Sequence, residues 1–163
     1  MRHLKNENGF SILEVVLAMS LLAILMGIAT INLFSATNKT YQNTATAILY
    51  TDLKSQQIKA MNGDTNGSGT TGAYGVYFLP TQYILFQGIT YSPSNPTNFA
   101  VKIPDDVKFT NILFPNSQII FASGSGEFAN FANGQNSVVI NGTGGSLGQK
   151  TVTINRFGVV TSN

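Results

Sequence analysis

The chain lacks most of the side chains that catalysis and covalent cross-linking require. It contains no cysteine and a single histidine, His3, and only 10% of its 163 residues are charged. Disulfides and thiolate ligands are therefore excluded. The acidic residues after Glu14 are few and scattered: Asp52, Asp64, Asp105, Asp106 and Glu127. Neither a Ser-His-Asp set nor a metal cluster can be assembled from this composition, so we expect no enzyme, no cofactor and no metal site.

Excess charge of one sign is also missing. The formal net charge is +2, which gives no overall attraction to nucleic acid or to an anionic membrane surface. The C-terminal segment, residues 156–163, holds one arginine, Arg156. We therefore do not expect nucleic acid as a partner. Proline is absent before Pro80, so no proline kink interrupts a helix in the first part of the chain.

A long apolar run lies near the start of the chain. From Val15 to Phe34 there is no charged residue, and a run of about 20 apolar residues is enough for one bilayer-spanning helix. Arg2 and Lys5 precede it and favour a cytoplasmic N-terminus. Glu14 lies at the edge of this run. A charge at mid-bilayer costs roughly 2.5–3.5 kcal/mol, less near the end of a span, so this glutamate needs an explanation.

The residues around Glu14 form a specific motif. The sequence Gly9-Phe10-Ser11-Ile12-Leu13-Glu14, with basic residues upstream and an apolar helix downstream, resembles the class III signal of type IV pilins and type II secretion pseudopilins. The resemblance implies that a prepilin peptidase cleaves between Gly9 and Phe10 and then N-methylates Phe10. Residues 1–9, which include His3, are then a leader peptide.

The same resemblance implies an assembly role for Glu14. Cleavage leaves a positive amine on Phe10, and a carboxylate inside a helical filament can pair with such an amine on its own or a neighbouring subunit. Two unit charges about 4 Å apart attract by roughly 4 kcal/mol at an effective dielectric near 20, and desolvation offsets part of this energy. We therefore expect the pair to favour subunits that lie at the correct height in the filament, because a misplaced subunit leaves Glu14 unpaired. The alternative is a tolerated glutamate that reaches interfacial water.

The helix is expected to continue beyond the apolar run. Residues 10–34 form the transmembrane and assembly helix, and residues 35–62 form an amphipathic half. Its apolar stripe is predicted to pack on a sheet, with Lys54 and Gln57 off the stripe. The stripe consists of Ala45, Leu49, Leu53 and Ala60.

Residues 63–163 are expected to form an extracytoplasmic β-rich domain. Alternation such as Thr151-Val152-Thr153-Ile154 predicts half-buried strands separated by glycine and proline turns. The predicted strands are Gly75–Leu79, Tyr83–Gln87, Phe99–Ile103, Val107–Phe109, Gln118–Ala122, Ser137–Asn141, Lys150–Asn155 and Val159–Thr161. The fold class is therefore α+β, a long N-terminal helix packed on an antiparallel β domain, with one sheet or two left open.

These expectations define a structural subunit of a filament. Within the family, the β-rich half, the Ile119-Ile120-Phe121 strand and the final hairpin most resemble an H-type minor pseudopilin. The resemblance implies several partners: other pilin or pseudopilin subunits, the prepilin peptidase, an inner-membrane assembly platform and membrane lipid. The chain would cross the inner (cytoplasmic) membrane once, with its N-terminus cytoplasmic, and then enter a periplasmic or surface filament. The machine is left open among type II secretion, a type IV pilus and DNA uptake for competence.

Two other interpretations of the N-terminal segment stay open. One is a signal-anchored extracytoplasmic binding domain that never polymerises. The other is an ordinary secretory signal peptide cleaved after Ala29, although Glu14 within the apolar region argues against it.

Two polar loops resemble ligand motifs but depart from them. Residues 142–151 resemble a phosphate-binding loop, yet Gln149 separates the last glycine from Lys150, and a strand follows instead of a helix. Asp64, Asn66 and Ser68 alternate like the start of a calcium loop. Its twelfth position, however, would be Gly75 where an acid is needed. Both segments are expected to be ordinary loops.

Overall fold

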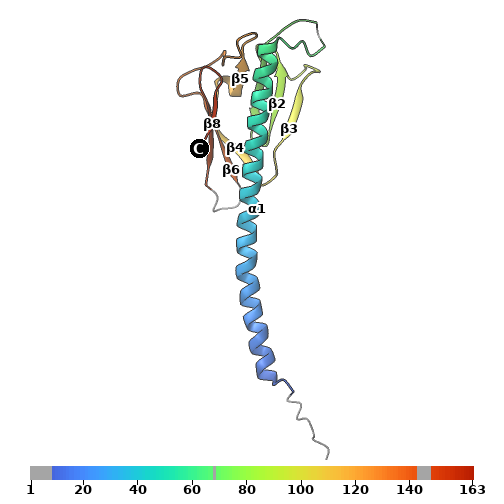
Figure 1. The fold of residues 1–163 in the computed structure, drawn as a ribbon, viewed down its shortest axis with the longest axis vertical. Coiled ribbons are helices and arrows are strands. Elements are labelled where there is room, and N and C mark those ends of the chain that lie inside the picture. Colours follow the sequence, from blue (N-terminus) through green and yellow to red (C-terminus); the bar gives the residue numbers. More distant parts are fainter. Residues whose placement is uncertain (1–8, 68, 143–147) are drawn as a thin grey trace, which may run out of the picture. The chain divides into compact units, whose positions relative to one another are not determined.

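The structure, a computed structural model, describes residues 9–67, 69–142 and 148–163, with the side chains of residues 31–38 left aside. The chain divides into two compact units, Met1–Ala36 and Thr37–Asn163. Helix α1, Ile12–Asn62, contributes residues to both units. The eight strands all belong to the second unit (Figure 1).

Both ends of α1 are set by local hydrogen bonding. The helix begins at Ile12, two residues later than predicted, and the backbone N–H groups of Glu14 and Val15 donate to the carbonyl of Ser11. At the C-terminus, Gly63 adopts a φ of 64°, a left-handed conformation that glycine reaches without steric cost. The paired bonds Gly63 N to Ala60 O and Asp64 N to Lys59 O complete a Schellman motif, which ends the helix.

The first sheet has the order β3-β2-β1-β5, and all of its pairs are antiparallel. Its strands are β1 Tyr74–Leu79, β2 Gln82–Gln87, β3 Phe99–Lys102 and β5 Gln118–Phe121. Strands β1 and β2 form a tight hairpin, and β5 is buried along its whole length.

The second sheet has the order β4-β6-β7-β8 and is also antiparallel. Its strands are β4 Val107–Leu113, β6 Ser137–Gly142, β7 Lys150–Ile154 and β8 Val160–Ser162. A short 3-10 turn, η1 Pro115–Ser117, leads from β4 into β5. The β domain thus has two four-stranded sheets, which decides the question that the sequence left open.

The predicted strands are all present, with shifted ends. The largest shift is at β4, which extends from Val107 to Leu113 instead of ending at Phe109. Its pairing with β6 changes register between Thr110 and Leu113, and Asn111 lies there with a φ of 46°. This irregularity hides the period-two alternation that a sequence pattern relies on. The α+β class and the terminal β7–β8 hairpin are confirmed.

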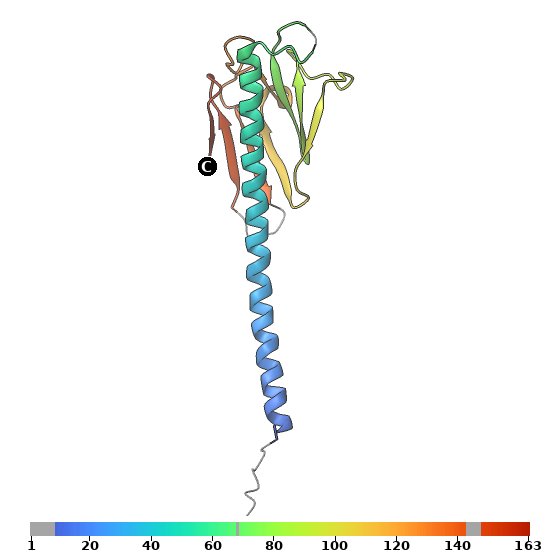
Figure 2. The same cartoon turned by 45° about the vertical axis from the view of Figure 1, so that its right-hand side comes forward.

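One hydrophobic core joins the second half of α1 to both sheets. The predicted helical stripe is confirmed, since Ala45, Leu49, Leu53 and Ala60 are all buried within this core. Figure 2 shows the two sheets spread behind this part of α1. Phe78 lies among aromatic rings from both sheets, with its centroid 5.5 Å from Phe109 in an edge-on contact, a preferred geometry.

The buried face of α1 also carries three glutamines: Gln42, Gln56 and Gln57. The prediction that Gln57 lies off this face is wrong, because its side chain is only 8% exposed. Its amide nitrogen donates to the carbonyls of Gly126 (2.9 Å) and Phe157 (3.2 Å). Gln42 likewise donates to the carbonyls of Ile140 and Gly148. Both buried side chains therefore find hydrogen-bond acceptors on loop or strand carbonyls, as buried polar groups usually do.

Candidate processing and assembly segment

The predicted cleavage site lies in an open stretch of backbone. Gly9, Phe10 and Ser11 precede the helix and are exposed, with the Phe10 side chain 82% exposed. A Cβ atom placed on Gly9 would meet no other atom within 4 Å. A protease that binds an extended backbone can therefore reach the Gly9–Phe10 bond before the first helical turn. The leader itself, apart from Gly9, lies outside the described residues.

Glu14 lies in the first turn of α1, and its side chain is exposed. A carboxylate at this position interacts favourably with the positive end of the helix dipole, typically by about 0.3–1 kcal/mol at an exposed site. The helix itself therefore tolerates the negative charge of Glu14. The charge costs free energy only where the carboxylate lies in an apolar environment. Phe10 lies two positions before Ile12, the first residue of the helix that carries Glu14.

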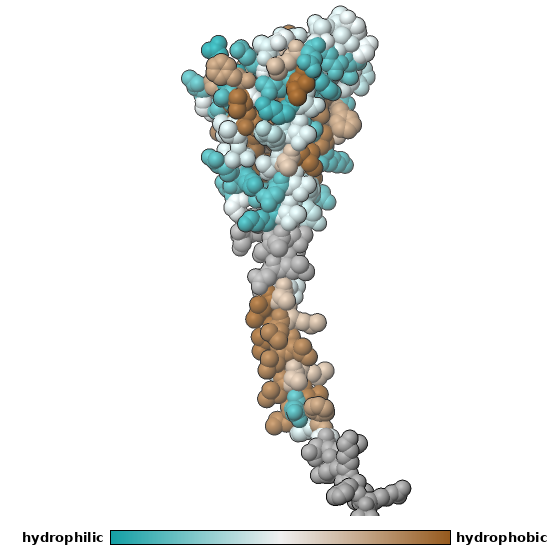
Figure 3. All heavy atoms as spheres, viewed as in Figure 1, coloured by the Kyte–Doolittle hydropathy of each residue, from teal (hydrophilic) through white to brown (hydrophobic). Residues whose placement is uncertain are grey.

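The segment Ile12–Thr30 has the length and composition of a membrane-crossing helix. Its mean hydropathy is 2.5 over 19 residues, which corresponds to roughly 29 Å at 1.5 Å per residue. None of it is buried within the structure, and Figure 3 shows its surface as almost continuously hydrophobic, with one hydrophilic patch near its start. A helix that is apolar on all sides needs an apolar environment, either lipid or other helices.

The two hydroxyl side chains in this segment are satisfied within the helix. Ser20 Oγ donates to the carbonyl of Leu17 (2.8 Å), and Thr30 Oγ1 donates to the carbonyl of Met26 (2.6 Å). Because these bonds are local, neither hydroxyl exposes an unpaired donor to hydrocarbon. Length and hydropathy alone are weak signals, since a secretory signal sequence passes the same test.

Comparison with protein families adds a specific signal. Residues 4–30 match the family model described as the prokaryotic N-terminal methylation motif. No curated protein and no solved structure matched the chain. This match supports a class III signal of the type IV pilin and pseudopilin kind at the start of the chain. The motif, together with the apolar helix, indicates a pilin-like protein that a prepilin peptidase processes and that is anchored in a membrane. Such a motif is typical of structural proteins that interact with other pilins.

The two loops that resemble ligand motifs show other roles. Asp64 Oδ1 accepts a hydrogen bond from the backbone N–H of Asn66 (2.9 Å), the geometry of an Asx turn. Ser68 lies outside the described residues, and among those described no group of His, Cys, Asp or Glu could hold a metal ion. Residues 143–147 of the other loop also lie outside them, while Gly148 accepts a hydrogen bond from Gln42, and Lys150 begins β7.

Sequence patterns missed the contacts that hold α1 on the β domain. Tyr83 on β2 donates a hydrogen bond to the carboxylate of Asp52 on α1. Burial raises the pKa of Tyr83, and the bond to Asp52 raises that pKa further. The three buried glutamines recur on one side of the helix, which is a weak signal, and nothing in the sequence identifies their distant partners.

Proposed function

We propose that this chain is a structural subunit, a minor pilin or pseudopilin, of a type IV pilus-like or type II secretion filament. The observation that carries the proposal is the methylation motif at residues 4–30, combined with an open Gly9–Phe10 bond and an exposed apolar helix that begins at Ile12. Prepilin peptidase cuts between Gly9 and Phe10 and N-methylates Phe10. This role requires no cofactor.

Residues 10–34 lie in two different apolar environments, one after the other. Residues 10–34 hold the precursor in the cytoplasmic membrane with its N-terminus inside. They later pack against equivalent helices of other subunits. The apolar surface of Ile12–Thr30 suits both surroundings, since lipid and neighbouring helices each remove it from water. An inner-membrane assembly platform transfers the subunit from lipid to the filament.

Glu14 supplies the register check during that transfer. A subunit at the correct height places the carboxylate beside the amine of Phe10 on itself or a neighbour, whereas a misplaced subunit leaves a charge unpaired among apolar side chains. Residues 35–62 then present the extracytoplasmic domain, residues 63–163, to the periplasm or cell surface. The β domain there contacts neighbouring subunits or the cargo of the machine.

The first experiment is the intact mass and N-terminal residue of the protein from membranes, with and without a co-expressed prepilin peptidase. We expect a chain that starts at N-methylated Phe10 only when the peptidase is present. A chain that starts at Met1 in both preparations would contradict the proposal. A start at Thr30 would identify an ordinary signal peptide, and the filament proposal would then be wrong.

The alternative function is a signal-anchored binding domain that does not polymerise. The exposed apolar helix also suits a permanent anchor, which is the observation in its favour. Replacement of Glu14 separates the two functions, because an anchor has no use for the carboxylate.

A further inference from the structure

A cavity of about 340 Å³ lies between α1 and the start of β7, within the β-domain unit. Its volume falls in the range of small-molecule sites, about 300–1,000 Å³. Gln42 on α1 joins its two walls, because the Nε2 atom of this buried side chain donates to the carbonyl oxygen of Gly148 over 2.8 Å. The segment that leads into Lys150 is therefore held against this part of α1.

Two lysines line this cavity, one from each wall. Lys39 lies on α1 three positions before Gln42, and residues three apart share a helix face. Lys150 is the first residue of β7. Neither Nζ atom forms a hydrogen bond or an ion pair with a described residue, and the described lining includes no acidic side chain. Because like charges repel each other, an anion between the two amines would be stabilised.

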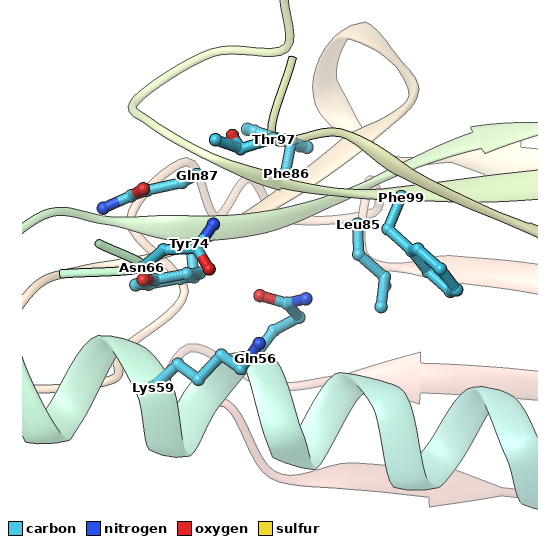
Figure 4. A pocket seen from close by; sticks show the side chains of 9 residues that line it. All are labelled: Gln56, Lys59, Asn66, Tyr74, Leu85, Phe86, Gln87, Thr97 and Phe99. Carbon is cyan, nitrogen blue, oxygen red and sulfur yellow. The ribbon is translucent and has the colours of Figure 1, made fainter. Parts of the chain in front are cut away.

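The two lysines farther along α1 have partners. Lys54 Nζ donates to Gln57 Oε1 over 3.0 Å, and Lys59 Nζ lies 5.8 Å from the centroid of the Tyr74 ring. Figure 4 shows Lys59 on α1 and Tyr74 on β1 at a second, smaller cavity. A cation over an aromatic face is already stabilised, so Lys59 needs no anionic ligand. The cavity at Lys39 and Lys150 lacks such a partner within the part of the chain that the structure describes.

The position of Lys39 in the chain indicates which anion is at hand. Lys39 follows Thr30, the last residue of the apolar membrane-crossing segment, by nine residues, which rise about 14 Å in a helix. The lipid headgroup layer extends about 5–8 Å beyond the hydrocarbon on each side. A helical side chain leans toward the N-terminus of its helix, which is the direction of the apolar segment. The Lys39 amine is therefore within reach of lipid phosphates.

We propose that this cavity binds the phosphate of an anionic phospholipid in the membrane that anchors the chain. Lys39 and Lys150 donate to phosphate oxygens, and the amides of Asn43 and Gln149, which also line the cavity, bond to the rest of the headgroup. The site rests on the membrane anchor of the proposed function and does not depend on polymerisation. The lipid is released when the subunit leaves the membrane.

Native mass spectrometry of the full chain in a non-ionic detergent tests the proposal. The probes are dioleoyl phosphatidylglycerol and dioleoyl phosphatidylcholine in equal amounts, which share their acyl chains and differ in net charge. We expect phosphatidylglycerol to be preferred about 25-fold, and the preference to be about fivefold lower in Lys39→Gln and in Lys150→Gln. Lys39→Arg should keep the preference, because it keeps the charge. The matched control is Arg156→Gln, which removes one positive charge at an exposed position beyond the other end of β7.

Four results would overturn the site. They are equal retention of the two lipids, an unchanged preference in both lysine variants, an equal loss of preference in Arg156→Gln, and displacement of phosphatidylglycerol by millimolar inorganic phosphate, which would indicate a site for free phosphate. Thermal unfolding identifies a Lys150→Gln variant that fails to fold, and Lys39→Gln, at an exposed position, keeps the test decisive in that case. The same spectra give the intact mass and thus the first residue, so failure of processing at Gly9 and failure of lipid binding are seen separately.

Discussion

The hydroxyl of Tyr83 on β2 donates a hydrogen bond to the carboxylate of Asp52 on α1, across 31 positions of the chain. Tyr83 is completely buried, while Asp52 lies at the partly exposed edge of the helix interface. Asp52 directly precedes Leu53, whose side chain is buried in the core. The bond therefore fixes the rotation of α1 on the sheet beside the centre of the apolar contact.

Removal of the Tyr83 hydroxyl should lower the free energy of unfolding of the β domain. In Tyr83→Phe the ring remains in the core, but the Asp52 carboxylate loses a charge-assisted bond, for which we expect about 1–2 kcal/mol. Chemical denaturation of the full chain in micelles measures the change. Tyr50→Phe is the control, since Tyr50 is 45% exposed on the same helix. Equal effects of the two substitutions would show that the Tyr83–Asp52 bond contributes nothing.

The same bond predicts a loss of stability in alkali. Burial, and then the bond to Asp52, raise the pKa of Tyr83 above its usual value of 10.0, so the unfolded chain releases this proton first as the pH rises. Below about pH 10 the stabilisation is fully present, and it decreases as the pH rises from there toward the folded-state pKa. Unfolding free energies of the unaltered chain and of Tyr83→Phe, at about pH 8 and about pH 11, should converge at the higher pH. A difference that stays constant would contradict this linkage.

The sequence predicted helices and strands correctly where the pattern of neighbouring residues determines them. The stripe from Ala45 to Ala60 follows the helical period, and strands such as β7 alternate every second residue, so both were predictable. The division into two sheets depends on which strands pair over long distances, and no local pattern records that choice. The irregular end of β4 was missed for a related reason, because Asn111 breaks the alternation there.

The candidate sites also differ in how far the sequence alone predicts them. Gly9, Phe10 and Glu14 form a contiguous motif, so sequence alone was sufficient to find them. The cavity at Lys39 and Lys150 joins residues from α1 and from the start of β7, which only folding brings together. A glutamine on a helix usually lies on a solvent-exposed face, so the residues next to Gln42 in the sequence do not predict that its side chain is buried.

Gly158 should be intolerant of even one added carbon. It has a φ of 75°, and a Cβ atom there would lie 2.2 Å from Gln57 Nε2 and 2.8 Å from the carbonyl oxygen of Gly126. Gln57 cannot move aside freely, because it donates to Gly126 and Phe157. We expect Gly158→Ala to lower the unfolding free energy by about 1–3 kcal/mol more than a substitution that meets no neighbour.

Gly134→Ala is the matched control for that prediction. Gly134 has a φ of 74°, and a Cβ atom there meets nothing within 4 Å. Its substitution costs only the left-handed backbone, about 1–2 kcal/mol. Thermal or chemical unfolding of both variants isolates the packing contribution by difference. Equal losses of unfolding free energy in the two variants would mean that Gln57 moves away from the added carbon without a cost in free energy.

Under the proposed function, Gly9→Leu should block processing without a change in the fold. The position is exposed and meets no neighbour, so a larger side chain has no partner in this chain to disturb. The same side chain would obstruct a peptidase that holds the backbone closely, and we expect cleavage to fall at least about tenfold. N-terminal sequencing measures cleavage, and the control is Gly148→Leu, at another exposed glycine where an added Cβ atom would meet nothing within 4 Å. Normal cleavage of Gly9→Leu would place the processing site elsewhere.

Glu14→Ala decides between the filament subunit and the permanent anchor. In the proposed filament, loss of the carboxylate leaves the Phe10 amine without its partner, and the energy difference between correct and incorrect register disappears. We expect normal membrane insertion and cleavage, with incorporation into sheared or crosslinked filaments reduced about tenfold or more. Glu14→Gln should fail similarly, because the amide keeps hydrogen bonding but not the charge. Glu127→Ala, at an exposed acid of the β domain, should assemble normally. Incorporation of Glu14→Ala at the level of the unaltered chain would favour the anchored binding domain, for which the carboxylate is only a cost of insertion.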